Sequence, residues 1–379
     1  MKDSGRWNSI ECHNLDQVDD ARDLVYRAVA ALSLGDPLVF SLGSVQGIVA
    51  SGLRDDTLDR VAASFPSRNE PGCLTLMLNG ADEVADWIPE LSCVGSRLAS
   101  RLWPGKTTLV FPVSGGESLI DHLSENVRTA IEFDGAVGFR LPGEPFVRDV
   151  LRLVAGPVIL RSFSEAEMND MQSLEEKLVA TGVKLVMEAG ESQENGPGTI
   201  VRVDGKKWSL LCDGELDDRT LARLAGKFLL FVCTGNTCRS PMAEALCKVL
   251  IAERLKCPVT ALESTGYVIL SAGIAALGGM PAASHAIDVV QARGGSLKQH
   301  SSGKLTSEMI DQADHIIVMT SDHLDALLEY VPEAAPKTRL LRPDGRDVAD
   351  PVGADRETYL RCSRAIESYL LPLRDELGI

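Results

Sequence analysis

The sequence predicts a two-domain α/β protein, and three observations support this fold class. The chain has 379 residues, which is enough for two domains of ordinary size. Apolar residues make up 45% of it and charged residues 24%, as in globular proteins rather than disordered or fibrous ones. Strand-like apolar runs alternate with helix-like segments along most of the chain, and this alternation favours parallel sheets flanked by helices.

A polar stretch over residues 213–227 divides the chain and leads into the apolar run FLLFV. We therefore predict a first domain over residues 1–222 and a second domain over residues 223–379. Within the first domain, residues 189–198 read AGESQENGPG. The glycines and the proline of this segment indicate a mobile loop.

The first domain is expected to form a twisted α/β sheet. An amphipathic helix is predicted over residues 16–34, with Asp16 as its N-cap, and another helix is predicted to end near Leu151. Runs rich in β-branched and aromatic residues predict four strands, which are DPLVFSL, CLTLML, TTLVFPV and PVILRSF.

The second domain alternates more regularly, and it is expected to form a parallel sheet flanked by helices. The predicted strands are 228–233, 268–273, 315–320 and 338–343. The predicted helices are 241–255, 282–293, 322–331 and 356–373.

Charge and composition exclude several classes of partner. Residues 1–222 carry 21 Lys and Arg against 35 Asp and Glu, so this half supplies −14 of the net charge of −16 and is a poor nucleic-acid binder. No secretory-type apolar segment begins the chain, and no apolar run approaches the ~18 residues of a membrane helix, so a cytoplasmic protein without a membrane partner is expected. Nine cysteines without a CxxC pair and six scattered histidines predict neither a disulfide framework nor a metal or other cofactor. The oligomeric state is left open.

The strongest motif is CTGNTCRS at residues 233–240, between a predicted strand and a helix that begins near Pro241. A loop in this position directs successive backbone N–H groups inward and forms a cradle for an anion. The Cys-x5-Arg spacing allows Cys233 to lie beneath a bound phosphoryl group while Arg239 binds two of its oxygens.

The same loop is expected to make Cys233 reactive. Backbone donors, the helix dipole and Arg239 stabilise a thiolate, and the Ser240 hydroxyl adds a further hydrogen bond. Gly235 is expected to allow the tight curve of the loop, and Asn236 to brace it. The alternative is that two cysteines merely pack at the end of a strand. If the loop does bind phosphate, its other members are Thr234, Gly235, Asn236, Thr237, Cys238 and Ser240, which surround Cys233 and Arg239.

A thiolate that attacks phosphorus needs a proton donor for the leaving group. Asp350, in the segment DVADPVG before the last predicted helix, is the candidate. Asp347 and Asp344 are its competitors.

Residues 227–379 resemble the low-molecular-weight protein phosphatase family, which includes tyrosine phosphatases and bacterial arginine phosphatases. The motifs that carry this resemblance are VCTGNTCRSPMAEA, SAGI at 271–274, Pro281, His300-Ser301, Met319-Thr320 and Asp350-Pro351. The resemblance implies Cys233 as nucleophile, Arg239 as phosphoryl clamp, and Asp350 as acid and then base. It further implies a phosphocysteine intermediate, phosphorylated protein substrates and no metal.

Two departures from the tyrosine phosphatases concern the substrate. Thr237 stands where those enzymes usually have an aliphatic residue and where arginine phosphatases have Thr. Val352-Gly353 follows Asp350-Pro351, where tyrosine phosphatases usually have aromatic residues. Both differences favour phosphoarginine, with phosphotyrosine as the alternative.

Other thiols and imidazoles of the second domain have weaker claims to a chemical role. Cys238 is matched in the family, where it forms a reversible disulfide with the nucleophile, so an oxidation switch is one interpretation and a plain loop cysteine the other. Arsenate reductases share the fold but need a close pair of later cysteines, whereas only Cys362 follows Cys257. His285 and His300 are assigned no chemical role.

Four segments of the first domain carry a second resemblance, and they are LVFSLGSVQGIVA, LWPGKTTLVFPV, VGFRLPGEPFVRDVLR and GTIVRV. On these segments, residues 15–215 resemble the YrdC-like family, which makes threonylcarbamoyl-adenylate. Several family positions are changed, namely Ser41, Leu42 and Gln46 in the first segment, PSRN at 66–69, and Ser162-Phe163-Ser164.

These changes predict a catalytically degenerate domain, because a site for ATP phosphates needs cations and this half is acidic. Arg68 and Arg140 remain as anion ligands or as structural ion-pair partners. The domain is then a regulatory module or a structural fusion partner. Two further alternatives are an active synthase, and a pseudoenzyme whose cysteine loop only binds phosphate.

Overall fold

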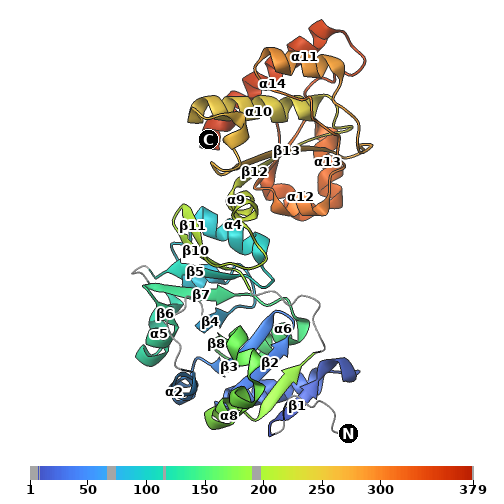
Figure 1. Ribbon diagram of the computed structural model, residues 1–379. Coiled ribbons are helices and arrows are strands. Elements are labelled where there is room, and N and C mark those ends of the chain that lie inside the picture. Colours follow the sequence, from blue (N-terminus) through green and yellow to red (C-terminus); the bar gives the residue numbers. More distant parts are fainter. Residues whose placement is uncertain (1–6, 8, 66–73, 114–116, 190–197, 378–379) are drawn as a thin grey trace. The chain divides into compact units, whose positions relative to one another are not determined.

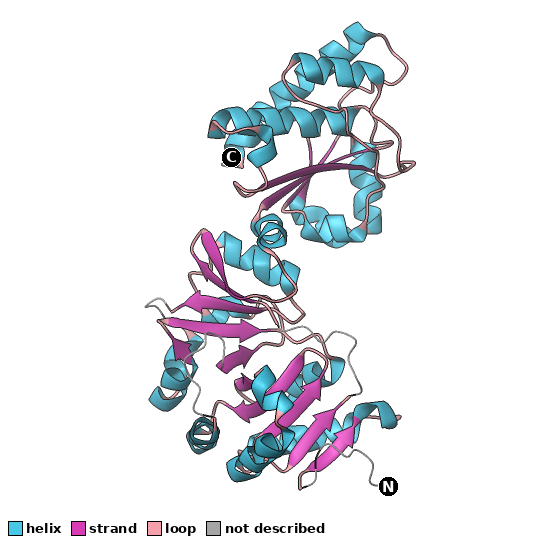
Figure 2. Ribbon diagram, viewed as in Figure 1, coloured by secondary structure: helices cyan, strands magenta, loops and turns pink. Residues whose placement is uncertain are grey.

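The computed structural model describes residues 7, 9–65, 74–113, 117–189 and 198–377, and its chain divides into two compact units between Thr220 and Leu221 (Figure 1). The division falls inside helix α9 (Asp218–Ala225), which occupies the polar stretch expected between the domains. The predicted boundary after residue 222 falls in the same helix. Each unit has its own sheet (Figure 2).

The first unit is built on a long mixed sheet, which contains both parallel and antiparallel strand pairs. The four predicted strands are present, and the remaining strands were not predicted. In sheet order the strands are β1 (Glu11–Asn14), β9 (Leu185–Glu188), β2 (Leu38–Leu42), β3 (Val45–Ser51), β8 (Val158–Ser162), β4 (Leu74–Met77), β7 (Ala136–Arg140), β5 (Thr108–Pro112), β10 (Ile200–Asp204) and β11 (Lys207–Cys212), with β6 (Glu132–Phe133) beside β7.

The first helix begins later than predicted. Leu15–Gln17 form a short 3-10 turn whose N-cap is Asn14. Helix α1 begins only at Arg22 and extends to Leu34, and the Asp20 carboxylate accepts from the Arg22 N–H at its start. Asp16 is therefore not an N-cap. The other helices of this unit are α2 (Asp55–Ser64), α3 (Val84–Trp87), α4 (Cys93–Leu102), α5 (Glu125–Ile131), α6 (Pro145–Leu153), α7 (Glu165–Asn169) and α8 (Met171–Thr181). Most of the predicted mobile loop, residues 190–197, lies outside the described residues.

The second unit has the predicted parallel sheet. Its strands are, in sheet order, β13 (Tyr267–Gly273), β12 (Lys227–Cys233), β14 (His315–Val318) and β15 (Thr338–Leu340). Helices α10 (Arg239–Leu255), α11 (Ser284–Ala292) and α14 (Arg356–Glu376) cover one face, and α12 (Ser307–Gln312) and α13 (Ser321–Tyr330) cover the other (Figure 1, Figure 2).

Strand β12 is apolar from Phe228 to Cys233, as expected of a strand that is buried on both faces. Leu229 and Phe231 enter the core beneath α10 and α14, whereas Phe228, Leu230 and Val232 enter the core on the opposite face. The chain runs from β12 to β13 on one side and then returns to β14 on the other. In open α/β sheets, such a change of side leaves a crevice at the carboxyl end of the strand, and here that end is Cys233.

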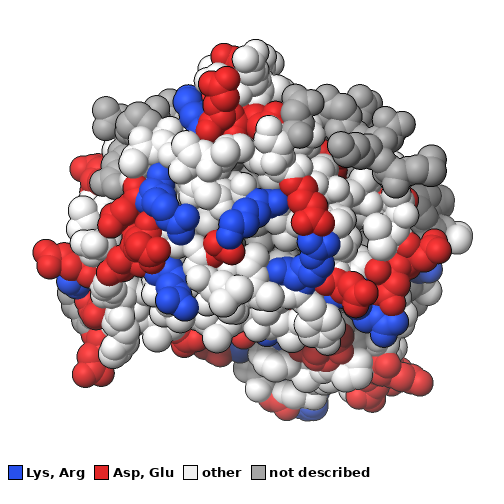
Figure 3. Space-filling view, turned by 90° about the horizontal axis from the view of Figure 1, so that it is seen from below, with Lys and Arg blue, Asp and Glu red and all other residues white. Residues whose placement is uncertain are grey.

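Among the described residues, no helix is long and apolar enough to cross a membrane. Figure 3 shows one face on which Lys and Arg side chains lie among Asp and Glu side chains. They do not form one continuous basic surface on that face.

Candidate active site

The loop between β12 and α10 surrounds the sulfur of Cys233. This side chain is buried, its Sγ lies 2.9 Å from the Ser240 Oγ, and the Asn236 N–H donates to it at 3.3 Å. Within the described part of the chain, the N–H groups of Thr237 and Cys238 donate to no other residue. The loop therefore offers hydrogen-bond donors both to an anionic sulfur and to an anion above it.

Asn236 holds the shape of the loop. Its φ of 54° lies in the left-handed region, and its fully buried side chain donates to the hydroxyls of Ser240 (3.0 Å) and Ser271 (2.9 Å). Its Oδ1 accepts from the Gly303 N–H at 2.9 Å. The expectation that Gly235 allows the tight curve is wrong, because the positive φ falls on Asn236 instead, where these hydrogen bonds hold it.

Two further contacts brace this loop from outside it. His300 Nε2 lies 2.8 Å from the Asn236 carbonyl oxygen, so His300 supports the backbone of the loop. The Ser271 hydroxyl donates to Glu244, which also pairs with Lys248. Asn236 is thus held by contacts with three separate segments of the chain, namely α10, β13 and residues 300–303.

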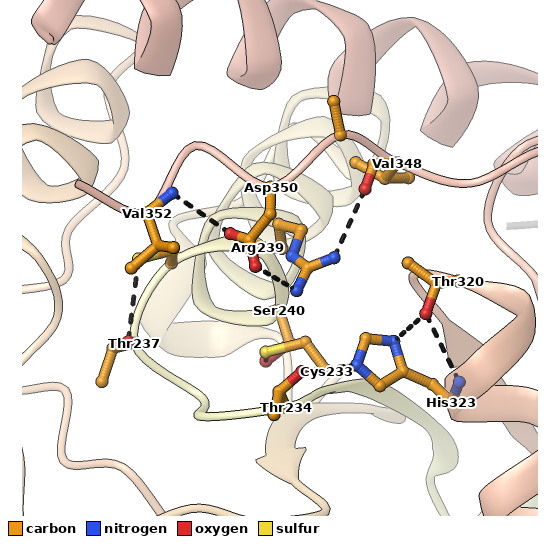
Figure 4. Close-up of polar contacts among 12 residues, drawn as sticks. Cys233, Thr234, Thr237, Arg239, Ser240, Thr320, His323, Val348, Asp350 and Val352 are labelled. Atoms are coloured by element: carbon orange, nitrogen blue, oxygen red, sulfur yellow. Dashed lines mark hydrogen bonds and ion pairs between the residues drawn. The ribbon is translucent and has the colours of Figure 1, made fainter. Parts of the chain in front are cut away.

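Arg239 and Asp350 meet above the loop (Figure 4). The buried Arg239 donates from Nη2 to Asp350 Oδ2 at 2.5 Å and from Nη1 to the Val348 carbonyl at 3.4 Å. The Asp350 side chain is 42% exposed, and its Oδ1 accepts from the Val352 N–H. A carboxylate is therefore held beside the cradle while it remains open to solvent.

The structure distinguishes between the three acidic candidates by their contacts. Asp347 accepts from the N–H and the hydroxyl of Ser321, the first residue of α13, at 2.8 and 3.2 Å. Asp344 pairs with Arg342 and Arg346 at the surface. Of the three, Asp350 is the one that contacts Arg239.

Thr237 and Cys238 lie on the α10 side of the loop. The buried Cys238 Sγ is 3.1 Å from the Tyr359 Oη. Burial and the contact with Cys238 raise the pKa of Tyr359, so its phenol stays protonated, and either the phenol or the thiol can donate in this hydrogen bond. Burial also raises the pKa of the Cys362 thiol to about 11, and this thiol contacts the carbonyl oxygen of Ala349.

His323, which the sequence analysis missed, contacts the loop from α13. Its Nε2 lies 2.8 Å from the Thr234 Oγ1, and its Nδ1 lies 2.7 Å from the Thr320 Oγ1 (Figure 4). Burial, and then the charge of Arg239, lower the pKa of His323, so the ring is neutral at neutral pH. The sequence signal was the helix start itself, with Thr320 as N-cap and His323 three residues later.

In the first unit, three of the changed family positions, Ser41, Leu42 and Gln46, flank the turn between β2 and β3. Arg140 is buried and donates from Nη2 to the Ser44 carbonyl at 2.7 Å, and burial lowers its pKa to about 10. Glu144 Oε1 accepts from both the N–H and the hydroxyl of Ser44, each at 2.6 Å. Arg68 lies outside the described residues.

Ser41, Leu42 and Gln46 belong to β2 and β3. Ser164 caps α7, beside a partly buried ion pair between Arg161 and Glu167. Within the described ranges, no three His, Cys, Asp or Glu side chains lie together as a metal site would require.

Comparison with known proteins gives a match for each unit. Residues 228–378 match the family described as low molecular weight phosphotyrosine protein phosphatase, and residues 31–214 match the Sua5/YciO/YrdC family, described as telomere recombination. A protein-arginine-phosphatase of Geobacillus stearothermophilus is 40% identical over 154 residues, which cover 39% of this chain and 95% of that protein.

Two further similarities concern the same unit. The low molecular weight protein-tyrosine-phosphatase Etp of Escherichia coli (strain K12) is 33% identical over 141 residues, which cover 37% of this chain and 86% of that protein. The solved structure of the YwlE arginine phosphatase from Geobacillus stearothermophilus is 38% identical, covers 40% of this chain and 93% of that chain, and gives a TM-score of 0.35. The chain thus belongs to the low-molecular-weight protein phosphatase family, and it joins this phosphatase unit to a YrdC-like N-terminal domain.

Proposed function

We propose that the second unit hydrolyses phosphorylated protein side chains through a phosphocysteine intermediate. The observation that carries this proposal is the convergence of Cys233, Arg239 and Asp350 from two distant segments at the carboxyl end of β12. Cys233 is the nucleophile, and Arg239 binds two phosphoryl oxygens. The backbone N–H groups from Thr234 to Ser240 bind the remaining negative charge.

The reaction proceeds in two displacements at phosphorus. The Cys233 thiolate forms an S–P bond while the bond from phosphorus to the leaving nitrogen or oxygen breaks, and Asp350 donates its proton to that leaving atom. The Asp350 carboxylate then takes a proton from water, and the water oxygen attacks phosphorus. The S–P bond breaks, phosphate leaves and the thiolate returns. Neither a metal nor another cofactor takes part.

Phosphoarginine is the substrate that we favour. The Thr237 hydroxyl accepts a hydrogen bond from a guanidinium group, whereas an aliphatic residue in its place would pack against an aromatic ring. Val352 and Gly353 offer no aromatic clamp after Asp350. Two relatives, from Geobacillus stearothermophilus and Bacillus subtilis, are named protein-arginine-phosphatase. Phosphotyrosine is the alternative, because other relatives are named tyrosine phosphatases.

The test is phosphate release from matched phosphoarginine and phosphotyrosine peptides by the wild type and by Cys233→Ser. A clear preference for phosphoarginine together with an inactive variant supports the whole proposal. A preference for phosphotyrosine retains the mechanism and overturns the substrate. If neither peptide is hydrolysed, the loop binds phosphate without catalysis and the mechanism is wrong.

We also propose that Cys238 forms a reversible disulfide with Cys233 under oxidation. Two thiols in one donor-rich loop favour thiolate oxidation and its resolution by the neighbouring sulfur. Hydrogen peroxide should inactivate the enzyme, and dithiothreitol should restore it. Unchanged recovery in Cys238→Ser would contradict this switch.

For the first unit we propose a YrdC-like domain that no longer makes the adenylate. Its β2–β3 turn directs two donors at Glu144, so a substrate anion must displace an internal carboxylate to bind there. We expect no pyrophosphate release from ATP with threonine and bicarbonate. Release above the rate of a heat-treated control would overturn this proposal.

A further inference from the structure

Thr234 is an exposed residue of the loop and directly follows Cys233. Its hydroxyl contacts His323 Nε2 at 2.8 Å, and the opposite ring nitrogen contacts Thr320 at 2.7 Å (Figure 4). A buried ring thus links an N-cap hydroxyl to a hydroxyl beside the nucleophile. None of the roles assigned above uses this chain of hydrogen bonds.

The direction of the chain follows from the cap. Thr320 Oγ1 accepts from the backbone N–H of His323 at 3.3 Å. Among the described residues, the other contact of the Thr320 hydroxyl is His323 Nδ1, so we assign its hydrogen to that nitrogen. In a neutral imidazole the other nitrogen then carries the proton, and Nε2–H donates to Thr234 Oγ1.

This assignment fixes what Thr234 presents to a substrate. One lone pair of its Oγ1 receives the Nε2–H, which leaves one lone pair and one hydrogen for other partners. An N–H group of a phosphorylated guanidine can donate to the remaining lone pair of Thr234 Oγ1, and the Thr234 O–H can donate to a phosphoryl oxygen. A phenyl ring has no N–H group and leaves the lone pair without a donor once water is excluded, which is unfavourable.

We propose that Thr234 is a second specificity-determining residue for phosphoarginine and that His323 is the positioning residue that orients its hydroxyl. This inference rests on the proposed function, and it deepens it by naming a second hydroxyl in addition to Thr237. His323 acts through Thr234 and does not contact the reacting atoms.

The experiment measures the ratio of kcat/KM for a phosphoarginine peptide to kcat/KM for the matched phosphotyrosine peptide. We expect Thr234→Val to lower this ratio about tenfold, the effect of losing roughly one hydrogen bond. Thr234→Ser keeps the hydroxyl and should keep the ratio within about twofold of the wild type. Circular dichroism spectra that match the wild type show that each variant is folded.

Two amide variants of His323 separate positioning from simple packing. His323→Gln carries an N–H group at the reach of Nε2 and should preserve the ratio. The shorter amide of His323→Asn can contact Thr320 but not Thr234, so this variant should lower the ratio as Thr234→Val does. The double variant His323→Asn/Thr234→Val should be no worse than either single variant, because both remove one interaction.

Several outcomes overturn the inference. A wild type without preference for phosphoarginine overturns it together with the proposed substrate. A wild-type preference that Thr234→Val leaves unchanged overturns this inference alone. Equal ratios in His323→Gln and His323→Asn, or additive losses in the double variant, would show that His323 does not orient the Thr234 hydroxyl.

Discussion

The two units each contain a turn that presents hydrogen-bond donors, and they use these donors differently. In the β2–β3 turn, Ser44 directs its N–H and hydroxyl at Glu144, and both donate to one carboxylate oxygen at 2.6 Å. In the loop after β12, the donors surround the sulfur of Cys233. Among the described residues of this loop, the nearby carboxylate of Asp350 pairs with Arg239 alone, so it does not occupy these donors.

The difference shows that donors form a ligand site only where the fold supplies no acceptor of its own. In the first unit, Glu144 fills the turn, and burial lowers the pKa of the neighbouring Arg140 to about 10. Neither Glu144 Oε2 nor Arg140 Nε has a hydrogen-bond partner among the described residues. In the second unit, the carboxylate is 42% exposed and can separate from Arg239 when a phosphoryl group enters.

The largest expected effect concerns the carboxylate of the open site. Asp350→Asn keeps the shape of the side chain but removes the acid, so kcat on a phosphoarginine peptide should fall by about 10²-fold or more. The matched control is Asp344→Asn, whose carboxylate pairs with Arg342 and Arg346 at the surface. If Asp344→Asn lost as much activity as Asp350→Asn, the assignment of Asp350 rather than Asp344 as the acid would be contradicted.

A second prediction concerns Asn236, which combines a left-handed backbone with a buried hydrogen-bonded amide. Asn236→Ala should lower the free energy of unfolding by about 2–3 kcal/mol, as measured by urea denaturation, and kcat/KM by about tenfold. Asn236→Gly relieves the backbone but not the lost hydrogen bonds. It should therefore recover stability in part and remain poorly active. Full activity in Asn236→Gly would show that the amide contacts are dispensable.

Substitutions of Glu144, which contacts the β2–β3 turn, should change the stability of the first unit rather than the phosphatase activity of the second. Glu144→Ala leaves the two Ser44 donors without their acceptor and should lower the free energy of unfolding by about 1–3 kcal/mol. Glu144→Gln keeps an accepting oxygen and should lose less. Phosphate release by the second unit should stay within about twofold of the wild type. A larger change would indicate that the first unit regulates the phosphatase.

The smallest effect is a pH dependence in the first unit. Burial tends to raise the pKa of Glu167, but hydrogen bonds from Arg161 and Ser164 outweigh it and hold this pKa below 4.5. Glu167 therefore stabilises the fold fully above pH 4.5, and this contribution is lost as the pH falls through the lowered value. The difference in unfolding free energy between the wild type and Glu167→Gln should shrink below pH 4.5. A difference that stayed constant from pH 7 to pH 3 would contradict this assignment.

The sequence alone determined the second unit to a large extent. Its four strands lie where the apolar runs predict them, and β12, buried on both faces, reads as a continuous apolar segment from Phe228 to Cys233. Helices α10, α11, α13 and α14 also lie where they were predicted, whereas α12 was not predicted. The Cys-x5-Arg loop is also local, since the strand end and the helix start that shape it are adjacent in the chain. The first unit was harder to predict, because its edge strands β1 and β11 are short or largely exposed.

Only the tertiary structure decided which distant groups meet. The sequence named Asp350 as the candidate acid, with Asp344 and Asp347 as competitors, and packing brought Asp350 to Arg239, 111 residues away. It also brought His323 to Thr234 and filled the β2–β3 turn with Glu144, 100 residues from Ser44. Local patterns encode helices, strands and loops, whereas contacts over such separations depend on how the layers pack, which no short stretch of sequence specifies.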